Sequence, residues 1–235
     1  MQQELETLKD WIDHSDNIVF FGGAGVSTES GIPDFRSVDG LYNQKYKFPP
    51  EEIISHSFYM KNKEEFYRFY KDRMLYEGAQ PNVTHKALAK LEEIGKVKSV
   101  ITQNIDDLHQ MAGSKNVLEL HGTLKKWYCL KCGKKDVKRF KCSCGGTVRP
   151  QVTLYGEMLD EDVTREAINE IANADTLIII GTSLTVYPAA YYITYFQGKN
   201  LVIINNDATQ YDNKASLVIN DNFASTMKKV LPLIK

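Results

Sequence analysis

Short apolar runs alternate along the chain with segments of helical periodicity. Strands are expected at residues 18–21, 97–102 and 117–120, and within 174–184, 200–207 and 216–221. Helices are expected at residues 4–13, 83–94, 160–173, 187–196 and 222–231. Repeated strand–helix units of this kind build a doubly wound parallel sheet, so the predicted fold class is α/β and Rossmann-like.

The segment from residue 40 to residue 80 departs from this alternation. It is rich in aromatic residues, and Pro49 and Pro50 interrupt it. We interpret it as a helical insertion that ends before Pro81. We expect residues 1–39, 81–124 and 151–235 to form the Rossmann-like domain, and residues 40–80 and 125–150 to form a smaller lobe.

Polar clusters follow four of the predicted strands. They are Gly22–Thr28, Gln103–Asp106, Thr182-Ser183 and Asn205. Ligands bind outside the carboxyl ends of the strands in doubly wound sheets, so these clusters are expected to share one crevice. The G-x-G-x-x-T of Gly23–Thr28 is half of a dinucleotide-binding signature, and it is weak evidence alone because glycine-rich turns are common. If it binds a dinucleotide, the backbone amides of residues 23–25 would approach the pyrophosphate.

The composition is that of an ordinary soluble globular protein, with 235 residues, 43% hydrophobic and 25% charged. No apolar run approaches the ~20 residues that a membrane helix needs. The N-terminal Met1-Gln2-Gln3-Glu4 lacks the basic and apolar regions of a signal peptide. We therefore expect a cytoplasmic protein with no membrane partner, and we expect it to be a monomer.

Charge is distributed unevenly along the chain. The net charge is −1, which gives no argument for nucleic acid as a partner. Residues 125–149 hold nine Lys and Arg and a single acid, Asp136, which leaves 20 basic and 29 acidic residues elsewhere. Because a run of like charges is usually a solvated face, nucleic acid is not an expected partner of this basic segment.

The cysteines are clustered. They are Cys129, Cys132, Cys142 and Cys144, in the pattern C-x-x-C followed by C-x-C. Paired thiolates at these spacings suit one tetrahedral zinc ion in a reducing compartment, and Gly133 and Gly145 give the turns backbone freedom. A redox-active pair is the alternative interpretation. Four protein ligands leave no open coordination position, so the expected zinc is structural and takes no part in catalysis.

Six motifs occur in an order that resembles one protein family. They are "GAGVSTESGIPDFRS", "TQNIDDLH", "ELHGT", the cysteine cluster, "RPQVTLYGE" and "GTSLTVYPAA". From about residue 16 to the C-terminus the chain resembles the sirtuins, NAD-dependent protein deacylases, in an undifferentiated bacterial form. The resemblance implies that the Rossmann-like domain binds NAD. It also implies transfer of the acyl group of acyl-lysine to ADP-ribose, with release of nicotinamide and free lysine.

The resemblance further implies a set of site residues. Catalysis would fall to His121, as general base, and to Asn104. NAD would be bound by Ala24, Thr28, Phe35, Arg36, Gln103, Ile105, Asp106, His121, Thr182, Ser183, Asn205, Asp221 and Asn222. The acyl-lysine protein or peptide would contact Thr153, Tyr155, Gly156, Tyr67 and Tyr70. Its backbone would add as an extended strand to "QVTLYGE".

Plainer alternatives exist for several of these assignments. A lone histidine at a strand end is more often a hydrogen-bonded structural residue, and Asn104 and Asp106 can cap a helix that opens at residue 107. Phe35 and Arg36 can be a packed ring and a surface cation beside a proline turn. For the whole protein, the alternative is a non-catalytic module whose basic zinc lobe binds nucleic acid while the main domain senses NAD or ADP-ribose.

Acyl-group preference depends on the helical insertion. Acid-selective members of the family bind the acyl carboxylate with a Tyr-x-x-Arg pattern. Aligning on Phe66-Tyr67 places Tyr70 at the arginine position, whereas a shift of one helical turn gives Tyr70-x-x-Arg73. We prefer the first register, which leaves an acyl carboxylate unpaired. Three positions also depart from the family pattern, namely Gly22 for Thr or Ser, Asp107 for Gly, and Thr153 for Val in the acyl-lysine tunnel.

Overall fold

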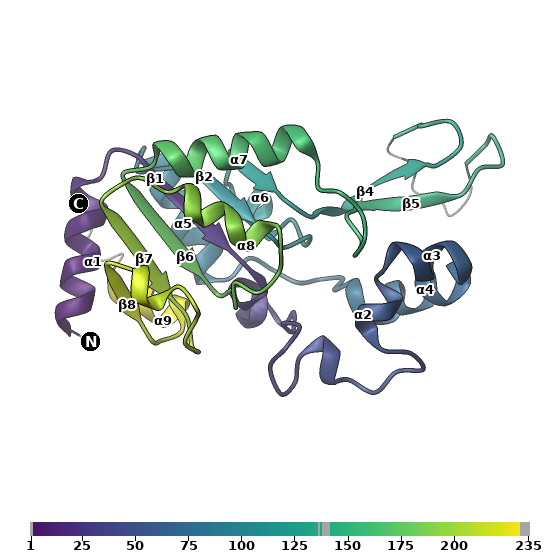
Figure 1. The fold of residues 1–235 in the computed structure, drawn as a ribbon, viewed down its shortest axis with the longest axis horizontal. Helices are drawn as coiled ribbons and strands as arrows, with labels where there is room; N and C mark the ends of the chain where they lie inside the picture. The colour runs from purple at the N-terminus through teal and green to yellow at the C-terminus, as the bar shows by residue number, and fades with distance from the viewer. Residues whose placement is uncertain (1, 136, 138–141, 231–235) are drawn as a thin grey trace.

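The central feature of the fold is a six-stranded parallel sheet with the strand order β3-β2-β1-β6-β7-β8 (Figure 1). The computed structural model describes residues 2–135, 137 and 142–230. The strands are β1 (Ile18–Gly22), β2 (Val97–Thr102), β3 (Val117–Glu119), β6 (Thr176–Ile180), β7 (Asn200–Ile204) and β8 (Leu217–Ile219). The strand order reverses between β1 and β6, which is where ligands bind in folds of this type.

Helices cover both faces of this sheet. On one face lie α1 (Gln2–His14), α5 (Val83–Glu93) and α9 (Phe223–Val230), and on the other lie α7 (Glu161–Asn173) and α8 (Ala189–Tyr192). Successive side chains of a strand point to opposite faces, so Phe20 packs with the first set and Phe21 with the second. Burial on both faces explains the uninterrupted apolar sequence of β1. The predicted doubly wound α/β class is confirmed.

The helix expected at residues 187–196 is shorter than predicted. The chain forms α8 only after Pro188 and tightens into a 3₁₀ turn, η4 (Ile193–Tyr195). Proline is favoured at the start of a helix, where its missing N–H is not needed. Residue 231, the last of the expected C-terminal helix, lies outside the described residues, as do 136 and 138–141 of the basic segment.

The two insertions pack against each other beside the sheet (Figure 1). The first contains η2 (Leu41–Asn43), α2 (Pro50–Ile53), α3 (His56–Lys61), α4 (Lys63–Phe69) and the π-helical turn η3 (Tyr70–Met74). The second contains an antiparallel pair, β4 (Gly122–Cys129) and β5 (Val148–Val152). Leu124 and Val152 join the aromatic core of the helical insertion. No described helix is long and apolar enough to cross a membrane.

Candidate active site

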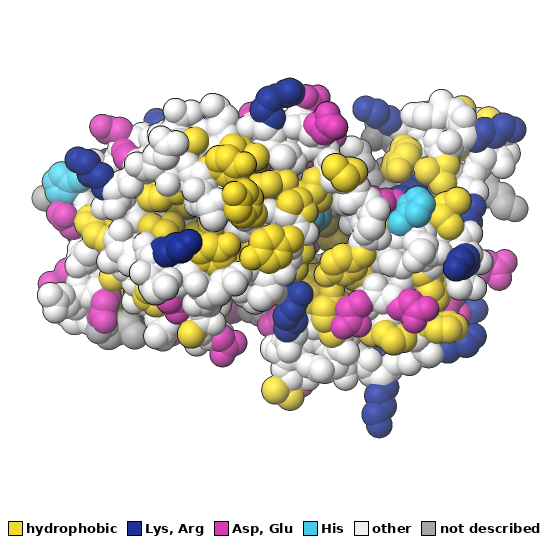
Figure 2. Space-filling model, viewed as in Figure 1, with side chains coloured by type: hydrophobic (Ala, Val, Ile, Leu, Met, Phe, Trp, Pro, Cys, Tyr) yellow, Lys and Arg dark blue, Asp and Glu magenta, His cyan; other side chains and the backbone are white. Residues whose placement is uncertain are grey.

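A cavity of about 670 Å³ lies at the carboxyl ends of β1, β2, β6 and β7 and extends to the small lobe. Figure 2 shows the surface hollowed between the two parts of the molecule. This volume is within the ~300–1,000 Å³ typical of ligand sites. The predicted residues that line it are Ala24, Thr28, Phe35, Arg36, Gln103, Asn104, Ile105, Asp106, His121, Thr153, Tyr155, Gly156, Thr182, Ser183, Asn205, Asp221 and Asn222. The structure therefore brings together residues from five of the six motifs, together with Asn205, Asp221 and Asn222.

The glycine-rich loop packs closely against the loop that follows β6. The Gly23 N–H donates to the Ile180 carbonyl at 3.1 Å, and the Gly25 N–H donates to the Gly181 carbonyl at 2.9 Å. A Cβ atom on Gly25 would lie 2.8 Å from the Gly181 Cα. Glycine is thus required for the approach of two backbones. Both N–H groups are bonded to carbonyls, so the expected approach of residues 23–25 to a pyrophosphate cannot rest on these two amides.

Ser27 connects two of the predicted site residues. It lies in η1 (Ala24–Ser30), the 3₁₀ helix after β1, and is almost completely buried. Its hydroxyl donates to Asp106 Oδ2 at 2.6 Å and accepts from Asn104 Nδ2 at 3.0 Å. Ser27 was absent from the residues predicted to form the site. Its position between Ala24 and Thr28, in the polar cluster after β1, is the signal that could have found it.

Asp106 also caps the helix that follows it, as the plainer alternative proposed. Its Oδ1 accepts from the Leu108 N–H at 2.9 Å, at the start of α6 (Leu108–Ala112). Burial raises the pKa of Asp106, while the bonds from Ser27 and Leu108 act in the opposite direction. Asn104 does not cap α6. Its side chain is directed to Ser27 instead.

Asp107 adopts a left-handed backbone conformation, with φ 62°. This region favours glycine, and Asp is one of the residues that tolerate it. The Thr123 hydroxyl donates to Asp107 Oδ1, and the Lys125 ammonium lies 3.8 Å from Oδ2. The departure from glycine therefore keeps the backbone conformation and gives the additional carboxylate two partners.

His121 lies between β3 and β4 and is held in a defined tautomer. Its Nδ1 is 2.9 Å from the Gln103 carbonyl oxygen. Because a carbonyl only accepts hydrogen bonds, Nδ1 carries the proton and Nε2 keeps its lone pair. Burial lowers the pKa of His121, although the bond to Gln103 acts in the opposite direction. The side chain is therefore a neutral base that lines the cavity.

The residues predicted to bind the rest of the dinucleotide lie at the ends of β2, β6, β7 and β8. Gln103 Nε2 donates to the Thr182 hydroxyl at 3.1 Å, which links the segments after β2 and β6. Asn205 Nδ2 donates to the Asp207 carbonyl at 2.9 Å, which shapes the loop after β7. Asn222 Oδ1 accepts from the Ala224 N–H at 2.8 Å and caps α9. These bonds fix the loops that form the cavity wall.

The loop that carries Phe35 and Arg36 closes over one side of the cavity. Asp34 Oδ1 accepts from the Arg36 and Ser37 N–H groups at 2.9 and 2.8 Å, which sets the turn. The Phe35 ring packs against Tyr42 with a centroid distance of 5.3 Å. The Tyr42 hydroxyl is hydrogen bonded to the Tyr155 hydroxyl at 2.7 Å, so this loop contacts the segment after β5.

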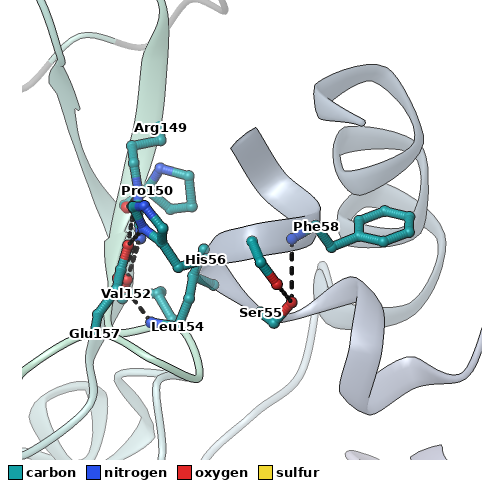
Figure 3. A network of polar contacts seen from close by, with 9 residues as sticks. Ser55, His56, Phe58, Arg149, Pro150, Val152, Leu154 and Glu157 are labelled. Atoms are coloured by element: carbon teal, nitrogen blue, oxygen red, sulfur yellow. Dashed lines mark hydrogen bonds and ion pairs between the residues drawn. The ribbon is translucent and has the colours of Figure 1, made fainter. Parts of the chain in front are cut away.

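A polar network fixes the segment after β5 to the small lobe (Figure 3). Arg149 donates to both oxygens of Glu157, at 2.6 and 3.0 Å, and His56 Nδ1 donates at 2.8 Å. Burial alone would raise the pKa of Glu157, but the bonds from Arg149, His56 and the Leu154 N–H lower it to about 2. The Glu157 carboxylate therefore stays ionised and holds the turn that carries Tyr155 and Gly156.

The backbone of the same segment is already paired in part. The Tyr155 N–H donates to the Ile54 carbonyl at 3.1 Å, and the His56 N–H donates to the Tyr155 carbonyl at 2.9 Å. The Thr153 N–H donates to the His121 carbonyl at 2.9 Å. A peptide strand added to this segment would have to pair with backbone groups other than these.

Tyr67 and Tyr70 do not line the cavity. The Tyr67 hydroxyl donates to the Val148 carbonyl, and the fully buried Tyr70 donates to the Leu124 carbonyl at 3.2 Å. The chain widens to a π-helical turn at Tyr70–Met74, which brings Arg73 and Met74 to the cavity instead. The structure thus gives the two tyrosines a packing role, and we propose no direct substrate contact for them.

The four cysteines form a second site, at the far end of the β4–β5 pair. Their sulfur atoms all lie within 4.8 Å of one another, and Cys129–Cys144 and Cys132–Cys142 are 3.5 and 3.7 Å apart. A tetrahedron with Zn–S bonds of ~2.3 Å has sulfur atoms about 3.8 Å apart, so the four thiolates fit one zinc ion. Gly133 and Gly145 have φ of 69° and 78°, as the predicted turns require.

Comparison with known proteins gives consistent matches along the chain. The model of the Sir2 family matches residues 23–188. An NAD-dependent protein deacetylase of Fusobacterium nucleatum is 57% identical over 220 residues, which cover 93% of this chain and 87% of the relative. A protein of the same description from Clostridium perfringens is 56% identical and covers 98% of this chain and 100% of the relative.

Solved structures agree with these matches. One solved structure, described as a study of the mechanism and regulation of Sir2 enzymes, has a TM-score of 0.90 and 38% identity. The match covers 99% of this chain and 98% of the chain in that structure. Another, described as Sir2 with a p53 peptide and NAD⁺, has a TM-score of 0.87 and 39% identity. This match covers 97% of this chain and 98% of the chain in that structure.

Proposed function

Because this chain belongs to the Sir2 family and is an NAD-dependent protein lysine deacetylase, we propose that its cavity holds NAD beside an acyl-lysine, with His121 as general base. The observation that carries the proposal is the hydrogen bond between His121 Nδ1 and the Gln103 carbonyl, at 2.9 Å. It leaves Nε2 unprotonated in a residue that lines the cavity. A general base needs both properties.

The residues of the cavity fit a dinucleotide. The cavity lies at the point where strand order reverses, with a glycine-rich loop after β1 and Asn205 after β7. When bound, NAD supplies the ADP-ribose that accepts the acyl group and the nicotinamide that leaves. Thr28, Thr182 and Ser183 bind the phosphates and Asn205 binds the adenosine ribose. Asp221 and Asn222 bind the adenine end.

The group Ser27–Asn104–Asp106 positions the reacting end of NAD. Asp106 and the Ile105 backbone hold the nicotinamide carboxamide, and Asn104 and Gln103 orient the ribose and the water. The two bonds between Ser27, Asn104 and Asp106 support this role, because they fix both side chains in one arrangement. Pre-positioned polar groups of this kind need no reorganisation during the reaction.

Phe35 shields the reacting atoms from water, and Arg36 contacts the polar groups of the cofactor. Exposure to water would divert the activated ribose to simple hydrolysis. The contact between Tyr42 and Tyr155 supports this role, because it joins the shielding loop to the segment on which we place the substrate. Thr153, Tyr155 and Gly156 line the entrance for an extended acyl-lysine peptide.

We propose that the substrates are acyl-lysine proteins and that the enzyme acts on them in the cytoplasm as a monomer. Four cysteines placed for one zinc support the compartment, because structural thiolates of this kind persist where thiols stay reduced. The alternative of a nucleic-acid-binding sensor has less support, because the neutral His121 and the fixed Asn104 and Asp106 are the parts that turnover needs.

Incubation with NAD and an acetyl-lysine peptide tests this proposal. We expect nicotinamide release that requires the peptide, with one deacetylated lysine formed for each nicotinamide released. Mass spectrometry of the peptide and chromatography of nicotinamide measure the two products. Nicotinamide release at the same rate without peptide, or NAD binding without any turnover, would contradict the proposed arrangement and favour the sensor.

We expect acetyl-lysine to be deacylated at least about 10-fold more efficiently than succinyl-lysine, because a buried carboxylate without a partner is costly. The buried Tyr70 occupies the arginine position of the preferred register and is already bonded to Leu124. Arg73 lines the cavity and donates to Gln44 Oε1 at 2.9 Å. The measurement is kcat/KM on matched peptides.

Arg73→Met and Arg68→Met form a matched pair of variants for this comparison. Arg68 lies on α4 with an exposed side chain, paired with Glu65 at 3.0 Å. Neither variant should raise the preference for acetyl-lysine substantially. A preference for succinyl-lysine that Arg73→Met removes and Arg68→Met retains would establish the shifted register and contradict ours.

A further inference from the structure

Three tyrosines form an exposed ridge beside the cavity. We call Tyr187, Tyr191 and Tyr195 the tyrosine ridge; their exposures are 59%, 52% and 41%. Tyr191 and Tyr195 are one helical turn apart, and their rings meet edge to face with a centroid distance of 5.8 Å. Figure 2 shows apolar side chains gathered over α8, next to the hollow between the two parts of the molecule. Contiguous exposed apolar surface marks interaction sites more often than isolated apolar side chains do.

The tyrosine ridge begins at the cavity itself. Tyr187 lines the cavity, as does Tyr155 from the segment after β5. Gln210 Nε2 donates to the Tyr187 hydroxyl at 3.3 Å and to the Leu184 carbonyl at 2.7 Å, which fixes this end of the ridge. The Tyr187 end of the ridge is therefore held in place beside the site in which we place the acyl-lysine.

The length of the ridge matches a few residues of extended peptide. Tyr187 precedes α8, and Tyr191 and Tyr195 are four residues apart across α8 and η4, which is about 6 Å at ~1.5 Å per residue. An extended peptide rises ~3.3 Å per residue, so about two residues would span the part from Tyr191 to Tyr195. A residue next to the acyl-lysine would meet Tyr187, and residues two to five positions away would meet Tyr191 and Tyr195.

The ridge offers apolar ring surface, and the charge beside it disfavours a cationic occupant. The Lys214 ammonium already lies 5.3 Å from the centre of the Tyr211 ring. The Tyr211 hydroxyl lies beside the Tyr187 hydroxyl, so this ring and its cation adjoin the ridge. A second cation would be repelled by Lys214. Tyrosine rings offer large contact areas at low cost in side-chain entropy, and they commonly dominate binding interfaces.

We propose that the tyrosine ridge binds a bulky apolar side chain of the substrate protein, two to five residues from the acyl-lysine. The inference rests on the proposed function, because it needs an extended acyl-peptide at the cavity entrance. The ridge is then a specificity determinant that selects among acyl-lysines by their sequence context. It makes no contact with the reacting atoms, so it acts on KM and leaves kcat unchanged.

The test compares three acetyl-lysine peptides that differ at one position. One has Phe three residues before the acetyl-lysine, one has Phe three residues after it, and the parent has Ala at both places. We expect Phe on one of the two sides to lower KM about 5- to 10-fold, which is the size of a single aromatic contact. The double variant Tyr191→Ser, Tyr195→Ser should remove this advantage, and Tyr191→Phe, Tyr195→Phe should keep it.

Two controls separate the ridge from the rest of the enzyme. Met60→Ser removes another exposed apolar side chain, from α3 and outside the cavity lining, and should keep the Phe advantage. A blocked single acetyl-lysine, too short to reach the ridge, should be turned over equally by every variant. Equal KM for all three peptides in the wild type, or loss of blocked acetyl-lysine turnover in the Ser variant, would overturn the inference. Failure of the wild type to deacetylate any of the three peptides would overturn the proposed function beneath it.

Discussion

Replacing His121 by alanine should lower deacetylation by about 10²–10⁴-fold, the range that a general base typically contributes. Fold and NAD binding should be retained, because among the described residues the His121 side chain makes one polar contact, to the Gln103 carbonyl. Its backbone carbonyl, which accepts from the Thr153 N–H, is unaffected by the substitution. Steady-state kinetics on an acetyl-lysine peptide and calorimetric titration with NAD measure the two effects.

The pH profile provides a second measurement of the same role. Burial lowers the pKa of His121 below its ordinary 6.5, so the neutral base persists as the pH falls through that value. The wild type should therefore keep most of its kcat/KM somewhat below pH 6.5, with a decline only at lower pH. His121→Ala should lose this acidic limb. The matched control is His14→Ala, because the His14 side chain is exposed and its loss should leave the pH profile unchanged. His109→Ala is unsuitable as a control, because His109 is buried in the fold. Activity of His121→Ala within a few-fold of wild type would exclude the general-base role.

The sheet could be predicted because its strands are buried on both faces. Burial of every residue of β1 and β6 leaves a continuous apolar run that periodicity detects directly. The expected bounds of residues 97–102 match β2. Strand direction then determined the location of the site, since parallel strands bring their carboxyl ends to one edge. Gln103, Thr182 and Asn205 meet in the cavity for that reason.

The small lobe was predicted less completely, because its geometry departs from regular periods. The pairing of β4 with β5 shifts between Thr123 and Trp127, and the burial of β4 does not alternate. A bulge of this kind removes the two-residue pattern that marks a strand. In the helical insertion, the π-helical turn after Phe69 changes which side chains face the cavity. The resemblance to the family pattern placed Tyr67 and Tyr70 on the substrate side, whereas neither of them lines the cavity.

Side-chain hydrogen bonds were the other feature that the sequence could not supply. Ser27 joins Asn104 and Asp106 across 77 and 79 residues, and no local pattern indicates this contact. The sequence also did not reveal the partners of the Gly23 and Gly25 N–H groups. A glycine-rich turn indicates that another group approaches the backbone closely, but it does not say whether that group is a ligand or the loop after β6.

Removing the zinc should unfold the end of the small lobe and abolish turnover, although the metal takes no part in the chemistry. β4 begins directly after His121 and ends at Cys129, and β5 runs from Val148 to the segment that carries Thr153. The pair Cys129↔Val148 closes the far end of this ladder, and Gly122↔Val152 closes the end beside His121. Loss of the zinc therefore frees the ladder that holds the general base next to the substrate segment.

The expected size of this effect is large, because structural zinc sites contribute apparent free energies of about 10–16 kcal/mol in small domains. Cys142→Ser and chelator treatment should each lower the melting temperature and expose residues 125–149 to protease. Ser143→Ala changes the residue between two of the ligands and should keep zinc, stability and turnover. The measurements are zinc content by atomic emission, thermal unfolding by circular dichroism, and nicotinamide release.

Protein that is shown to be metal-free and still keeps full turnover would contradict a structural role for the zinc. Loss of turnover without any loss of stability would instead indicate that the metal takes part in the chemistry. That result would contradict the arrangement of four sulfur ligands, which leaves the zinc no open coordination position.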